Sequence, residues 1–187
     1  SAGLEERTLI VFISDNGGPT RELTSSNHPL RGEKGALLEG GIRVPFLLQW
    51  KGRVPAGVVE PRMVSTLDLF PTVVVAAGAA PAANLDGVDL LPHLAAGAAT
   101  GIPIRAQHYW RVGPQAALRA GDWKLLRARG DPKWQLYNLN DDIGEERDLA
   151  ATQPAKVAEL EAAWRALDRQ MVEALWPAGG GGGRRAR

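Results

Sequence analysis

Apolar residues in the first half of the chain predict two buried strands joined by a long connection. A continuous apolar run covers residues 8–13 and ends at a polar turn sequence, residues 14–18. A strand without polar alternation is typical of a parallel sheet that helices cover on both faces. The same argument predicts a second buried strand at residues 44–50. The connection between them, residues 19–43, has little periodicity, and connections of that length are usually functional.

Start and stop signals predict two helices before residue 100. Ser65 and Pro71 stand where a helix begins, and Gly78 stops the apolar pattern that follows them. These signals predict a helix over residues 65–77. A short second helix is predicted over residues 90–97, after an Asp-Gly turn.

The second half of the chain predicts a small antiparallel sheet and a C-terminal helix. Short strand patterns separated by turns occur at residues 108–110, 116–119, 123–127 and 134–139. Strands connected in this way form a meander. A helix is predicted to begin near Thr152, with Pro154 in its first turn, and to stop at Pro177, because apolar residues recur at steps of three and four and form one stripe. That stripe consists of Val157, Leu160, Trp164, Leu167, Met171 and Leu175. The helix is expected to cover one face of the meander.

The fold class predicted from these patterns is α/β, with three parts along the chain. Residues 1–103 are predicted to belong to an α/β domain. Residues 104–176 are predicted to form a small antiparallel β subdomain with its terminal helix, and residues 177–187 a flexible Gly/Arg tail.

Composition and charge exclude several classes of function. The chain has 187 residues, 44% of them hydrophobic and 23% charged, as in an average globular protein. A net charge of +1 argues against a nucleic-acid partner, because phosphate contacts require an excess of Lys and Arg. The absence of Cys excludes disulfides, zinc–thiolate sites and thiol nucleophiles within this chain. No apolar run approaches the roughly 18–20 residues of a membrane span, so no membrane contact is expected. The sequence assigns no compartment.

Asp15 and Asn16 follow directly after the first predicted strand, where ligand sites of open α/β sheets form. A carboxylate and an amide oxygen side by side are hard donors that suit Ca²⁺ or Mg²⁺. The alternative is a purely structural turn, because Asp-Asn-Gly-Gly is a strong turn sequence. A calcium ion takes about 6–8 oxygens, so other ligands would have to come from elsewhere.

Three further residues are candidates for binding an anionic substrate. Lys34 lies between two glycines and could hold an oxyanion, although a loop lysine is usually only solvated. Arg43 either binds an anion or pairs with Glu39, and pairing is the preferred interpretation. His108, beside two aromatic residues, is the histidine of greatest interest.

Several ordered motifs together resemble the C-terminal third of the formylglycine-dependent, arylsulfatase-like sulfatases of the alkaline-phosphatase superfamily. The sequence reads ISDNGG at 13–18, LRGEKG at 30–35 and EGGIRVP at 39–45. The resemblance continues through residues 65–72, 86–92, 121–125, 136–139 and 145–149, and covers about residues 7 to 176. It implies the C-terminal part of an alkaline-phosphatase-like sandwich, followed by a small antiparallel sheet packed against a C-terminal helix.

The resemblance also implies roles for individual residues. Asp15 and Asn16 correspond to two ligands of an active-site Ca²⁺, with Mg²⁺ as the alternative ion, and Lys34 corresponds to the lysine that contacts the sulfate ester. In this family a hydrated formylglycine attacks sulfur, and the cation and lysine stabilise charge on the sulfuryl oxygens. Lys34 would then be catalytic and substrate-binding, with Arg43 and His108 as further substrate-binding candidates.

Departures from the family pattern limit what this chain can do. The Cys/Ser-x-Pro-x-Arg segment from which formylglycine is made is absent, and so is the family's early Asp-Asp metal pair. Formylglycine is therefore expected in a missing N-terminal part, and the chain alone is expected to be inactive towards sulfate esters. A sheet without its neighbouring strands should expose an edge and apolar surface. Self-association or pairing with the missing part is expected.

Three other interpretations stay open at this point. A phosphodiesterase or phosphonate hydrolase of the same superfamily shares the metal pair and the order of lobes. A non-catalytic binding module would have kept the fold and lost the chemistry. The third is a truncated product with no function of its own.

Overall fold

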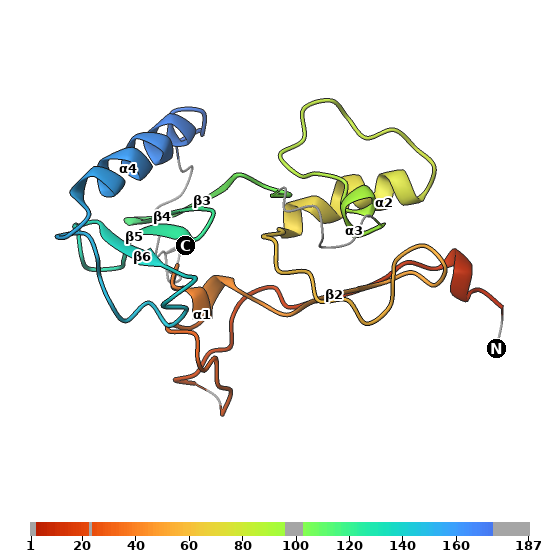
Figure 1. Ribbon diagram of the computed structural model, residues 1–187, viewed down its shortest axis with the longest axis horizontal. Coiled ribbons are helices and arrows are strands. Elements are labelled where there is room, and N and C mark those ends of the chain that lie inside the picture. Colours follow the sequence, from red (N-terminus) through yellow and green to blue (C-terminus); the bar gives the residue numbers. More distant parts are fainter. Residues whose placement is uncertain (1–2, 23, 96–102, 174–187) are drawn as a thin grey trace, which may run out of the picture. The chain divides into compact units, whose positions relative to one another are not determined.

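The computed structural model describes residues 3–22, 24–95 and 103–173 (Figure 1). The chain divides into two compact units, one of residues 1–14 and 45–106 and the other of residues 15–44 and 107–187. The predicted division at residue 103 did not anticipate that residues 15–44 group with the C-terminal sheet. The tail at residues 177–187 lies outside the described residues.

The first unit contains a two-stranded sheet of β1 (Ile10–Ile13) and β2 (Phe46–Gln49), preceded by the short helix η1 (Glu5–Arg7). The strands are antiparallel, with Phe12 opposite Leu47. The predicted parallel pairing is therefore wrong for these two strands. An apolar run indicates burial, but it carries no information about the direction of the neighbouring strand.

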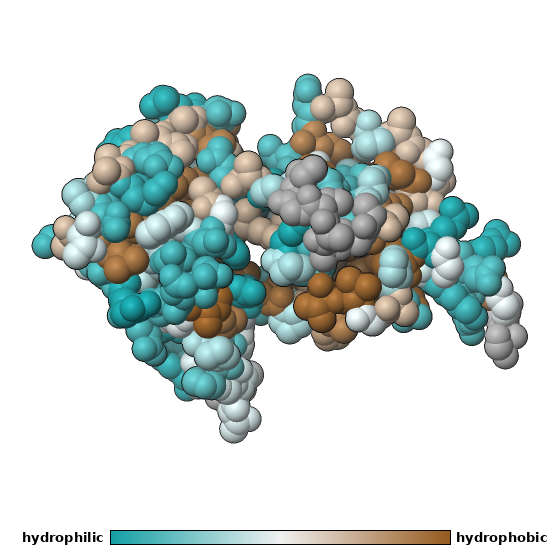
Figure 2. Space-filling view, in the orientation of Figure 1, coloured by the Kyte–Doolittle hydropathy of each residue, from teal (hydrophilic) through white to brown (hydrophobic). Residues whose placement is uncertain are grey.

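One face of this sheet is apolar and exposed, as expected for a sheet that lacks its neighbouring strands. Ile10, Phe12 and Leu47 are 53%, 64% and 58% exposed. Side chains alternate between faces, and directly opposite residues share a face, so these three residues lie together. Figure 2 shows brown, hydrophobic surface in the region where Figure 1 draws β2.

The predicted helix over residues 65–77 is confirmed. It consists of a 3-10 turn, η2 (Thr66–Asp68), and α2 (Leu69–Ala76). Ser65 and Asp68 form a capping box, in which the Asp68 carboxylate accepts a 2.7 Å bond from the Ser65 backbone amide. Asp68 is fully buried and also pairs with Arg105. The second predicted helix is present as α3 (Leu91–Ala95), and its predicted end near Gly97 lies outside the described residues.

The second unit is built on the predicted antiparallel meander, which has four strands in sequential order. They are β3 (Gln107–Val112), β4 (Gln115–Ala120), β5 (Trp123–Arg127) and β6 (Gln135–Asn138). Alternate residues face opposite sides of the sheet. One side packs against α4 (Pro154–Asp168) through a core of Ala116, Leu118, Leu125, Leu136, Leu160 and Trp164. The other side packs against the segment around α1 (Glu39–Ile42) through Leu37, Ala117, Leu126, Tyr137 and Leu139.

The C-terminal helix is confirmed where it covers the sheet, but it ends earlier than predicted. It stops at Asp168 rather than at Pro177, and Met171 lies beyond it, 43% exposed. Arg111 contacts this end of the helix, because it pairs with Asp168 at 2.7 Å and also donates to the Val172 carbonyl at 2.7 Å. Leu175 lies outside the described residues. No helix among the described residues has the length and apolar character needed to cross a membrane.

Candidate functional site

The loop after β1 and the turn that carries Lys34 lie side by side in the second unit. The Gly17 amide donates to the Gly41 carbonyl at 3.0 Å, and the Lys34 amide donates to the Gly18 carbonyl at 3.4 Å. The Asn27 side chain joins the same loops, because its amide group donates to the carbonyls of Gly18 at 2.9 Å and of Gly32 at 3.1 Å. The three motifs that the sequence analysis singled out therefore meet in one place.

Close backbone contact explains why this meeting point is rich in glycine. A Cβ atom on Gly17 would overlap the Gly40 carbonyl oxygen, and one on Gly40 would overlap the Gly32 carbonyl oxygen. Both positions require glycine because backbone, which cannot swing aside, occupies the space of a side chain. The repeated glycines thus let three loops stack and bring Lys34 near the segment that follows β1.

Asp15 and Asn16 form a local turn at the end of β1. The Asp15 carboxylate accepts a 2.9 Å bond from the Asn16 amide, and the Asn16 side chain donates to the Gly17 carbonyl at 3.0 Å. Asp15 is exposed. Carboxylate and amide oxygens are the donors that Ca²⁺ prefers, so these residues fit two positions of a calcium shell. No group of three acidic or histidine side chains in the described part of the chain could complete it.

The charge beside Lys34 is already compensated by other residues. Glu33 accepts a 2.8 Å bond from the Thr20 hydroxyl and pairs with Arg21 at 2.9 Å. The Thr20 hydroxyl lowers the pKa of the Glu33 carboxyl, and Arg21 adds to this effect. Lys34 is exposed, and no contact of its side chain with Glu33 is needed to balance that carboxylate.

Arg43 and His108 occupy different surroundings. Arg43 pairs with buried Glu39 at 3.6 Å, which is the structural pairing that the sequence analysis preferred. His108 lies in β3, where its ring packs edge-on against Trp110 with centroids 4.4 Å apart. The structure therefore places His108 on the meander rather than in the stacked loops, and substrate binding by either residue stays a prediction.

A buried charge network beneath these loops was missed by the sequence analysis. Lys124 is fully buried in β5, and its ammonium lies 2.9 Å from a Glu39 oxygen and 2.7 Å from a Glu145 oxygen. Arg43 at 3.6 Å and Arg119 at 3.9 Å approach the other Glu39 oxygen. Lys124 stands among apolar residues of β5, and a lysine in such a strand is a signal that could have pointed to a buried partner.

Burial raises the pKa of the Glu145 carboxyl above its ordinary value, although Lys124 opposes the change. A carboxyl with a raised pKa binds its proton more tightly in the folded chain than in the unfolded one. The stability that it contributes is fully present below the ordinary pKa and is lost as the pH rises through the raised value.

We therefore expect the free energy of unfolding of the native chain to fall relative to that of Glu145→Gln as the pH rises from about 4 to about 7. The amide keeps the shape and an acceptor oxygen but does not titrate in this range. Urea unfolding at a series of pH values measures the difference. Parallel pH profiles, or a difference that grows in the opposite direction, would contradict the raised pKa.

Comparison with known proteins places these features in a family. The Sulfatase family profile matches residues 1–79. Over 145 residues, 75% of this chain and 27% of the relative, the sequence is 37% identical to N-acetylgalactosamine-6-sulfatase of Canis lupus familiaris. It is 32% identical to a sulfatase of Formosa agariphila over 181 residues, 82% of this chain and 31% of the relative.

Solved structures agree with the sequence relatives. The crystal structure of Ps i-CgsB in complex with k-i-k-neocarrahexaose superposes with a TM-score of 0.79 at 33% identity, covering 93% of this chain and 39% of that one. The chain thus spans only about a third of the length of the proteins that it matches. The neighbours have the alkaline-phosphatase-like fold, as the sequence motifs implied. With motifs, structure and relatives in agreement, the chain belongs to the sulfatase family.

Proposed function

We propose that this chain is the C-terminal part of a sulfuric ester hydrolase and that it supplies part of the sulfate and cation site. The observation that carries the proposal is the contact between the loop after β1 and the Lys34 turn, where the carbonyl of Gly18, two residues after Asn16, accepts from the Lys34 amide at 3.4 Å. Two hard oxygen donors and one exposed ammonium then lie on neighbouring loops. A doubly charged cation and a sulfate ester oxygen are the groups that such donors bind.

Each residue has a distinct task in this proposal. Asp15 and Asn16 would hold Ca²⁺, or Mg²⁺, together with ligands from the rest of the parent enzyme. When bound, the cation supplies positive charge that stabilises the sulfuryl oxygens. The Lys34 ammonium binds an ester oxygen and stabilises the charge that develops there as the S–O bond breaks. The leaving alcohol oxygen takes a proton, and Lys34 is positioned as a candidate donor.

The nucleophile must come from outside this chain. The sequence has neither a Cys nor a Cys/Ser-x-Pro-x-Arg segment. We therefore propose that formylglycine belongs to the missing N-terminal part of the parent enzyme. That part would also cover the exposed apolar face of Ile10, Phe12 and Leu47.

The isolated chain is accordingly expected to show no turnover of a chromogenic aryl sulfate above background, because the attacking group is absent. Sedimentation of the same preparation should show self-association through the apolar face. Replacing Phe12 and Leu47 by Ser should make it monomeric. Turnover by the isolated chain would refute the proposed division of the site, and a monomeric native chain would refute the role of the apolar face.

An assay of the full-length parent tests the reaction class. We expect hydrolysis of an aryl sulfate in the presence of Ca²⁺, with much weaker hydrolysis of an aryl phosphodiester or phosphonate. A preference for the phosphorus esters would favour the phosphodiesterase or phosphonate hydrolase alternative. Saturable binding of a sulfated sugar without cation and without turnover would favour a binding module.

A further inference from the structure

The loop that carries Lys34 is attached at both ends to Glu145, in the connection between β6 and α4, and in the middle to β4. At one end Arg31 donates to the Glu145 carbonyl, and at the other the Glu39 amide donates to the Glu145 carboxylate at 2.6 Å. In the middle the Gln115 side chain donates to the Gly35 carbonyl at 3.0 Å. Glu145 therefore binds both ends of residues 31–39, with its backbone at one and its side chain at the other.

Glu145 is held in an unusual backbone conformation that serves these two contacts. Its φ is 55°, in the left-handed region, and it is the non-glycine residue with a positive φ in the described part of the chain. Such a conformation persists only where the surroundings enforce it. Asp142 supplies the enforcement, because its carbonyl accepts from the Glu145 amide at 3.2 Å and its carboxylate accepts from the amides of Glu146 and Arg147 at 3.1 and 2.8 Å.

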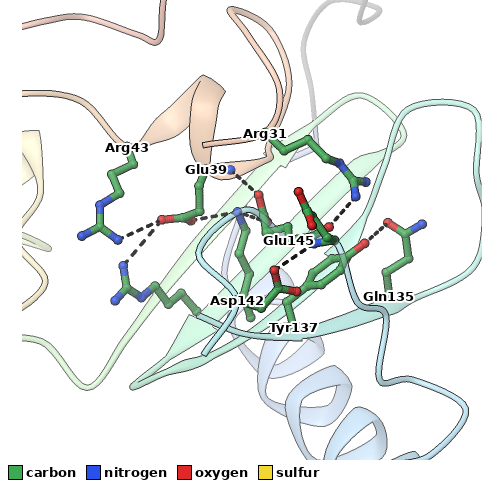
Figure 3. A network of polar contacts seen from close by, with 10 residues as sticks. Arg31, Glu39, Arg43, Gln135, Tyr137, Asp142 and Glu145 are labelled. Carbon is green, nitrogen blue, oxygen red and sulfur yellow. Dashed lines mark hydrogen bonds and ion pairs between the residues drawn. The ribbon is translucent and has the colours of Figure 1, made fainter. Parts of the chain in front are cut away.

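Charge and packing reinforce the same attachment. Lys124 lies between the carboxylates of Glu39 and Glu145, so it joins the far end of the loop to the residue that binds it. The Arg31 guanidinium lies 5.9 Å from the centre of the Tyr137 ring, within the range of a cation–π contact. Figure 3 shows Arg31 and Glu39 converging on Glu145 from the loop side.

We propose that Glu145 is a positioning residue, which sets the place of Lys34 by binding both ends of its loop to the connection between β6 and α4. The expected effect on catalysis rests on the proposed function, whereas the expected effect on the loop does not. It gives the small antiparallel sheet a role in the active site although its strands carry none of the proposed cation ligands. A shift of about 1 Å in a catalytic group can cost as much as about a hundredfold in rate.

Hydrogen exchange and kinetics on the full-length parent test this role together. In Glu145→Ala we expect backbone exchange over residues 32–41 to rise about tenfold while exchange in β4 and β5 stays unchanged, because the loop alone loses its anchors. The kcat/KM for an aryl sulfate should fall about tenfold. Glu145→Gln should recover part of both losses, since its amide oxygen can accept from the Glu39 amide, although its NH2 group cannot replace the oxygen that contacts Lys124. Glu146→Ala, an exposed neighbour, is the control and should change neither.

Arg31→Met provides a second variant, because Arg31 is exposed and its replacement should not prevent folding. It should loosen residues 32–36 even if Glu145→Ala does not fold. Unchanged exchange of the loop in both folded variants would overturn the proposal, and so would a uniform rise over the whole meander. Faster loop exchange without any loss of kcat/KM would support the anchoring by Glu145 and contradict the catalytic role of Lys34.

Discussion

Lys124→Met is expected to lower the free energy of unfolding of the chain by about 3–5 kcal/mol. The lysine is fully buried, and its removal leaves the carboxylates of Glu39 and Glu145 without their shared partner. Arg43 and Arg119 are too distant, at 3.6 and 3.9 Å from one Glu39 oxygen, to replace a 2.7–2.9 Å contact. Methionine fills a similar volume, so the loss reflects charge rather than a cavity.

Urea unfolding followed by tryptophan fluorescence measures this loss, because four of the six tryptophans lie among the described residues of the second unit. Lys156→Met is the control. Lys156 also pairs with a carboxylate, Glu159, at 2.6 Å, but on the surface of α4. A surface pair contributes at most about 1 kcal/mol. Equal losses of unfolding free energy in the two variants would contradict the stabilisation that we assign to the buried charge network.

Lys34→Ala in the full-length parent is expected to reduce kcat/KM for an aryl sulfate by about a hundredfold to a thousandfold. The ammonium is proposed to bind an ester oxygen more strongly in the transition state than in the ground state, so much of the loss should appear in kcat. The fold should be unaffected because the side chain is exposed.

Lys133→Ala removes another exposed loop lysine of the same unit and should leave the kinetics unchanged. Steady-state rates over a range of substrate concentrations separate the change in kcat from the change in KM. If Lys34→Ala retained its kcat, Lys34 would be no more than a surface lysine, the alternative that its sequence context left open.

The meander and its helix could be predicted because their signals are local. Turn residues separate the four strands, and alternation assigns their side chains to two faces. The end of α4 was predicted too late along the chain: its last residue, Asp168, contacts Arg111, which lies 57 residues earlier and leaves no local signal in the sequence. The antiparallel pairing of β1 with β2 was missed for a similar reason, because a continuous apolar run is the same for either strand direction.

The candidate site was predictable as a set of motifs but not as an arrangement. Asp15, Asn16 and Lys34 were proposed from motifs that resemble a known family, and their roles stay a prediction, whereas the stacking of their loops depends on backbone contacts between Gly17 and residues 40–41. The network around Lys124 escaped prediction because its partners Glu39 and Glu145 lie 85 and 21 residues away along the chain. Charges so distant in sequence show no pattern until the chain has folded.

The calcium dependence of aryl sulfate turnover by the full-length parent tests the central claim most directly. We expect Asp15→Ala to require at least about tenfold more Ca²⁺ for half-maximal activity, because it removes a charged ligand. Asp141→Ala, which removes an exposed carboxylate elsewhere in the same unit, should respond like the native enzyme. An unchanged calcium requirement in Asp15→Ala would contradict the assignment of this loop to the cation site.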